Sequence, residues 1–192
     1  SALRPRVAVL LGIDKKWHLP LLLCRGLSTI PPIWWGFQCT GFLVRYRTRG
    51  AIIESSTGRF TLKERLVLTE ILLAILWCTA SAYLSFFFAD CLMSRWLLHY
   101  TPSATLVRLF TINAVYMYLT SWTLHLSGAA VKPQLLLPAW ISIALTLTVL
   151  YHLTQRKSNI RRETSAAIRV FWLASFISMC LLLIQIHLRT ED

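Results

Sequence analysis

The sequence predicts an all-α integral membrane protein: a four-helix transmembrane bundle that follows an N-terminal proline-broken or interfacial helical segment. Apolar side chains make up 56% of the 192 residues and charged ones only 15%, whereas soluble domains average about 45–50% and about 25%. The apolar residues are also clustered in stretches near the length of about 20 residues that a membrane-crossing helix needs. This composition excludes an intrinsically disordered chain and a soluble nucleic-acid-binding domain.

The basic N-terminal segment, residues 1–65, contains a broken apolar stretch. We expect a helix over 17–29, an interruption at Pro31–Pro32 and a short second helix over 34–44. The reason is that proline lacks an N–H and disfavours helical backbone in the residue before it. Tryptophans in this stretch favour a position at the lipid headgroups. A re-entrant segment and a broken crossing remain open.

Residues 66–192 form the predicted membrane domain. It contains four apolar stretches, each with at most one Asp, Glu, Lys or Arg, placed near the start of the stretch. A charge so close to a helix end can extend its side chain to the membrane surface. The predicted spans are 66–89, 104–126, 135–154 and 168–188.

Twenty basic residues against eight acidic ones give the chain a net charge of +12, and their distribution bears on orientation. If the N-terminal segment does not cross, the side holding residues 45–65 leads by 13 basic residues to 7, and both chain ends face the cytosol. If it crosses, the opposite side leads by 12 to 8. We start from the first arrangement, and the sequence leaves the second open. The basic loops are expected to face anionic headgroups, not nucleic acid.

Five cysteines lie in or beside apolar segments without a Cys-x-x-Cys pair. This pattern predicts small buried side chains, with no metal site and no disulfide framework. Nothing in the sequence indicates a cofactor.

Two helix faces are typical of helix packing in membranes. The second predicted span carries polar residues along one sector, among them Asn113, Tyr116 and Thr120, which fit hydrogen bonds between helices or a substrate channel. The first span carries small residues, which allow a second helix to approach closely. These small residues are Ala74, Cys78, Ser81, Ala82, Ser85 and Ala89.

A polar cluster is expected where the first span ends and the second begins: Asp90, Arg95, His99 and Arg108. An acidic group among basic ones at a low-dielectric boundary should form ion pairs that fix this hairpin. Alternatively, Arg95 and Arg108 could bind the phosphate of a lipid headgroup or of a polyprenyl phosphate. A second carboxylate for catalytic Mg²⁺ is not evident, and no residue stands out as a nucleophile. We therefore predict no catalytic residues.

A longer pattern connects these features. It runs without a gap from Trp77 to Phe110 and includes Ser81, Ser85, Asp90, Arg95, Trp96 and Arg108. Two further stretches fit the same pattern: Cys24-Arg25 with Pro31-Pro32 near the start, and 173–179 in the last span. In these residues, over about 18–180, the chain resembles the fungal N-glycosylation protein family.

The resemblance implies a multi-pass protein of the endoplasmic reticulum membrane that is required for normal N-glycosylation. The budding-yeast member is linked to oxidative-stress tolerance as well. Because the family brings no catalytic motif, we expect an accessory or scaffold factor that holds glycosylation enzymes or a polyprenyl-phosphate lipid. An enzyme or binder acting on a phosphorylated lipid headgroup through Asp90, Arg95 and Arg108 is the alternative, and a small transporter is a third hypothesis.

Overall fold

The computed structural model describes residues 12, 14–57, 62–128, 135–155 and 161–191. Among these residues the regular secondary structure is helical, without strands, which confirms the all-α prediction. The helices are α2 (Lys15–Leu27), α3 (Ile30–Thr57), α4 (Leu62–Leu97), α5 (Pro102–Leu126), α6 (Leu136–Gln155) and α7 (Arg161–Glu191).

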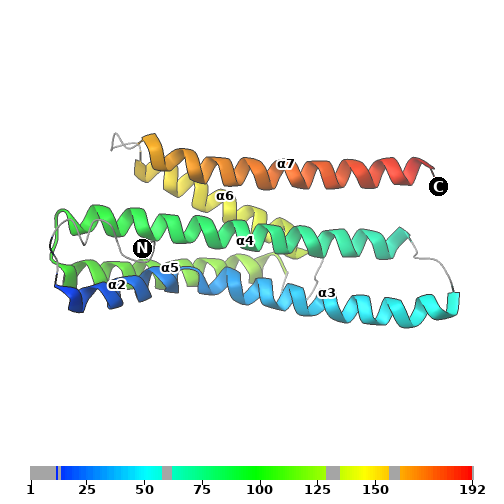
Figure 1. Ribbon diagram of the computed structural model, residues 1–192, viewed down its shortest axis with the longest axis horizontal. Helices are drawn as coiled ribbons and strands as arrows, with labels where there is room; N and C mark the ends of the chain where they lie inside the picture. Colours follow the sequence, from blue (N-terminus) through cyan, green and yellow to red (C-terminus); the bar gives the residue numbers. More distant parts are fainter. Residues whose placement is uncertain (1–11, 13, 58–61, 129–134, 156–160, 192) are drawn as a thin grey trace.

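Helix α4 is the central element of an elongated bundle. It contacts each of the other described helices. Helices α2 and α3 follow one another along α4, and α5, α6 and α7 lie beside it with their long axes in roughly the same direction (Figure 1). Because so many partners share one helix, the largest buried cluster is built around it. This cluster includes Trp77 and Cys78 of α4, Cys39 of α3, Trp140 of α6 and Ala174 of α7.

The interruption in the N-terminal segment differs from the prediction. Helix α2 ends at Leu27, and α3 already begins at Ile30. Pro31 and Pro32 therefore lie in the first turn of α3, and the break between the two helices comes before them. The first N–H groups of a helix have no acceptor within the helix, so prolines at these positions remove no hydrogen bond. Helix α3 also continues to Thr57 and is longer than the expected 34–44.

Helices are present at all four predicted spans, with ends that differ from the predicted ones. Among the described residues, Leu66–Leu97 of α4 is the one stretch both long enough and apolar enough to cross a membrane by itself. Shorter apolar stretches lie at Leu136–Leu150 in α6 and Ile168–Ile184 in α7. The four-span bundle is therefore not confirmed by length and hydropathy, and the division of the chain at residue 65 stays a prediction.

Large apolar side chains cover much of the outer surface of the bundle. Phe37 is 75% exposed, Trp172 70%, Tyr118 68% and Val107 67%, and they belong to α3, α7 and α5. Soluble monomers rarely expose apolar surface over so many elements, and extensive exposure of this kind marks membrane or protein contacts.

Helices α3 and α4 approach closely at Gly36. A Cβ added there would lie 3.5 Å from Cβ of Cys78, whereas a Cβ added at Gly41 would meet nothing within 4 Å. We expect Gly36→Leu to lower the unfolding temperature in detergent, because extra methylenes forced into a packed contact cost about 1–3 kcal/mol. Gly41→Leu makes the same change on the same helix and should have little effect. Equal losses in the two variants would contradict the α3–α4 contact.

Candidate functional site

The candidate site lies where α2 ends against α4 and α5. Arg25, in the last turn of α2, places its Nη1 atom 2.6 Å from Oδ1 of Asp90 on α4. The Arg25 side chain is only 11% exposed and that of Asp90 33%. The guanidinium also lies over the ring of Phe86, 3.9 Å from its centroid. A charge this well covered is stable only with a counter-charge beside it, so the ion pair fixes α2 on α4.

The end of α2 has its backbone carbonyls satisfied by side chains. Asn113 of α5, which is 4% exposed, donates from Nδ2 to the carbonyl oxygen of Cys24 at 2.6 Å. Ser28 donates to the carbonyl of Arg25, and Thr29 to that of Gly26, each at 2.7 Å. The last carbonyls of a helix have no partner within it, and in apolar surroundings each unpaired carbonyl is costly. The break between α2 and α3 is therefore capped on several sides.

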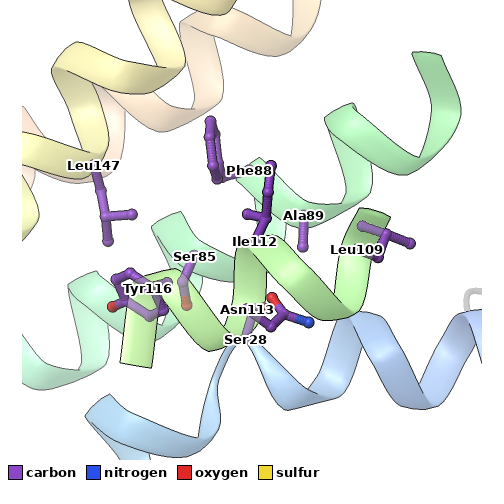
Figure 2. Close-up of a pocket in the computed structure, with 9 residues that line it drawn as sticks. All are labelled: Ser28, Ser85, Phe88, Ala89, Leu109, Ile112, Asn113, Tyr116 and Leu147. Atoms are coloured by element: carbon purple, nitrogen blue, oxygen red, sulfur yellow. The ribbon is translucent and has the colours of Figure 1, made fainter. Parts of the chain in front are cut away.

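A small cavity lies next to this capped break (Figure 2). Its volume is about 10 Å³, room for about one water molecule. Ser28, Ser85, Asn113 and Tyr116 supply polar groups to a wall that is otherwise apolar. The Tyr116 hydroxyl is buried without a hydrogen-bond partner among the described residues. A water here would have several polar neighbours, but the cavity is too small for a substrate or cofactor.

The predicted polar cluster is arranged differently from the expected hairpin staple. The ion pair shown for Asp90 joins α4 to α2, not to α5. Arg108 of α5 is exposed, and its guanidinium stacks on Tyr100, 3.7 Å from the ring centroid. Arg95 is partly buried and His99 is exposed. Sequence reasoning included Arg25 in the family pattern but missed its pairing with Asp90. A lone arginine in an apolar segment is the signal that a counter-charge must lie nearby.

The small-residue face of α4 lies inside the bundle. Five of its six members are at most 3% exposed, and Ala82 is partly buried. Among the other residues of the family pattern, Trp77 donates from Nε1 to Oγ of Ser178 on α7 at 3.0 Å, Pro31 and Pro32 are buried, and Cys24 and Trp96 are partly buried. Neighbouring helices therefore pack directly against this face.

The cysteines of the described chain are free thiols. Within the same residues, no group of three or more His, Cys, Asp or Glu side chains is arranged to hold a metal ion. The geometry around Arg25 thus includes one ion pair, one cation–π contact and several capping hydrogen bonds, while Nε of Arg25 is buried without a hydrogen-bond partner among the described residues.

Two yeast proteins are similar to this chain over most of its length. Residues 68–171 match the profile of a family described as N-glycosylation protein, EOS1. The chain is 32% identical over 152 residues to N-glycosylation protein eos1 of Schizosaccharomyces pombe, covering 77% of this chain and 62% of that protein. It is 28% identical over 178 residues to N-glycosylation protein EOS1 of Saccharomyces cerevisiae, and this match covers 72% of this chain and 48% of that protein. The matches thus cover about half to three-fifths of these relatives, and no solved structure shows significant similarity.

The ion pair leads to a prediction about stability. Asp90→Ala leaves the covered Arg25 charge without its partner. Because the Asp90 side chain is 33% exposed, the cost should be below the about 3–5 kcal/mol that removing one member of a fully buried pair carries. We expect a corresponding loss in the free energy of unfolding in detergent. The double variant Arg25→Met/Asp90→Leu should recover most of that loss, because apolar side chains often replace a buried ion pair without penalty.

Arg108→Gln is the control for this series, since the exposed Arg108 contributes only a cation–π contact of about 0.5–1 kcal/mol. A double variant as unstable as Asp90→Ala would show that the pair does not hold α2 on α4.

Proposed function

The chain belongs to the EOS1 family of N-glycosylation proteins, and from this premise we propose that it is a multi-pass protein of the endoplasmic reticulum membrane that assists N-linked glycosylation as a non-catalytic accessory factor. The two yeast relatives are N-glycosylation proteins by name, which supports the role in N-glycosylation. The observation that carries the accessory role is the Arg25–Asp90 ion pair, because it uses the most covered charges of the site to join helices.

The spacing of charges on α4 supports a membrane crossing. No Asp, Glu, Lys or Arg lies between Glu70 and Asp90. These two residues are 20 positions apart, or about 30 Å along an α-helix, which matches the thickness of the hydrocarbon core. Asp90 would then lie at one membrane surface and Glu70 at the other.

Helices α2 and α3 together have a matching interval. Arg25 and Arg45 are also 20 positions apart, with no charged residue between them. Arg25 meets Asp90 at one end, and Gly36 lies against Cys78 farther along α4. Because the break between the two helices is capped, its backbone can lie within the membrane boundary. We therefore treat α2 and α3 as one broken crossing, in place of the interfacial segment that the sequence also allowed.

A contact between α4 and α7 agrees with the same interval. The hydrogen bond between Trp77 and Ser178 joins the middle of α7 to the middle of the α4 interval, which supports a crossing by α7 as well. With α5 and α6 added, the chain would cross five times, so its two ends would lie on opposite sides. The side that holds the N-terminal end then carries 12 basic residues against 8 and should face the cytosol.

The competing hypothesis is an enzyme or binder that acts on a phosphorylated lipid headgroup through Asp90, Arg95 and Arg108. It has less support, because the Asp90 carboxylate is engaged by Arg25 and Arg108 is stacked on Tyr100. The adjacent cavity holds about 10 Å³, which does not accommodate a headgroup.

A topology measurement tests the five crossings. Short tags that carry an N-glycosylation acceptor are appended to either end of the chain and expressed in yeast. We expect the C-terminal tag to acquire a glycan and the N-terminal tag to stay unmodified, because only lumenal sites are glycosylated. The same result at both ends would contradict an odd number of crossings.

A rescue experiment tests the accessory role. The chain and its variants are expressed in fission yeast that lacks its own relative, and glycan occupancy of a secreted reporter is measured by its mobility before and after deglycosylation. We expect rescue by the native chain and by Arg25→Met/Asp90→Leu, and failure with low protein abundance for Asp90→Ala. Loss of rescue in the double variant at normal abundance would favour charge-dependent chemistry at the site.

A further inference from the structure

Helix α3 has a groove on a face that no other described helix covers fully. The groove has a volume of about 200 Å³. Three of its six lining residues are aromatic, and two of them, Trp34 and Phe37, are 61% and 75% exposed. Its lining residues are Trp34, Phe37, Gln38, Gly41, Phe42 and Arg45. Gly41 lines this groove, and a Cβ added at this position would meet nothing within 4 Å, so a larger side chain there has room to extend.

A second groove continues from the first. It has a volume of about 220 Å³, shares Trp34, and is bounded by Pro31 and Trp35 of α3 and by Met117 and Thr120 of α5. Trp34 therefore stands between two hollows that together follow α3 from Arg45 toward α5. From Arg45 to Trp34 the helix rises about 16 Å, close to the depth of one leaflet of a hydrocarbon core of about 30 Å.

Two polar groups of the first groove lack partners. Neither the Gln38 amide nor the Arg45 guanidinium has a hydrogen-bond partner among the described residues, and both side chains are exposed. Placing the Arg45 cation beside hydrocarbon, or the Gln38 amide within hydrocarbon, costs free energy unless another polar group pairs with it. The groove thus has the positive charge of Arg45 at one end and the Gln38 amide two helical turns deeper. Its apolar walls extend over about the depth of one leaflet.

We propose that the α3 groove binds a phospholipid with an anionic headgroup, its phosphate on Arg45 and one acyl chain lying over Gly41 toward Trp34. The charge of Arg45 complements the phosphate, and the Gln38 amide can donate to an ester carbonyl of the same lipid. Arg47, exposed one half-turn beyond, adds positive potential without lining the groove. The site rests on the membrane crossing proposed above for α2 and α3.

The test measures lipid binding to the purified full chain in dodecyl maltoside micelles. Dioleoyl-phosphatidylserine is titrated against dioleoyl-phosphatidylcholine, and bound lipid is counted by native mass spectrometry. We expect the native chain to retain one phosphatidylserine in preference to phosphatidylcholine. Arg45→Gln should weaken this binding about tenfold, since it removes a charge-assisted hydrogen bond. Gly41→Leu should abolish it by filling the groove, and a normal unfolding temperature shows that the fold is intact.

Arg47→Gln is the matched control, because it removes the same charge from the same helix outside the groove and should keep the preference. Equal retention of the two lipids, equal losses in Arg45→Gln and Arg47→Gln, or preferential retention of a prenyl phosphate would each overturn the proposal. End tags on opposite sides of the membrane together with any of these results would remove the lipid site alone. End tags on the same side would remove the crossing on which the site depends.

Discussion

The ion pair between Arg25 and Asp90 connects two helices that are 65 residues apart in the chain. Each group would be costly in apolar surroundings by itself, and together they can be covered. The pair fixes the end of α2 at one level of α4, so that α3, which starts three residues later, must follow the rest of α4. The approach of Gly36 to Cys78 and the position of the α3 groove depend on this register.

The same register explains how a helix break can lie inside the bundle. Asn113, Ser28 and Thr29 pair with the last carbonyls of α2, and the prolines that follow lack N–H groups that would need acceptors. The polar groups around Arg25 therefore act on the protein's own backbone and charges. This arrangement is suited to holding helices together, and it agrees with an accessory role in N-glycosylation better than with a reaction at Asp90.

The sequence predicted the helical class and the location of α4 to α7, because long uncharged stretches are read directly from composition. It also indicated which face of α4 consists of small residues. It missed the partner of Asp90, since a contact between residues 25 and 90 leaves no periodic signal. It misplaced the break because prolines are tolerated in the first helical turn. It shortened α3 because the apolar stretch ends at Val44, where Arg45, Arg47 and Arg49 follow, whereas the helix continues through them. The second groove, between α3 and α5, depends on how these two helices lie beside one another, which only the assembled fold shows.

Cross-linking in the membrane tests the register most directly. In a chain whose native cysteines are replaced, Leu21→Cys is paired with Met93→Cys, because these two side chains belong to one buried cluster and the ion pair stays intact. Glu70→Cys takes the place of Met93→Cys in the control, and membranes are treated with a short membrane-permeant thiol cross-linker. We expect an intramolecular cross-link between positions 21 and 93 and none between 21 and 70. A cross-link between 21 and 70, or none between 21 and 93, would contradict this register.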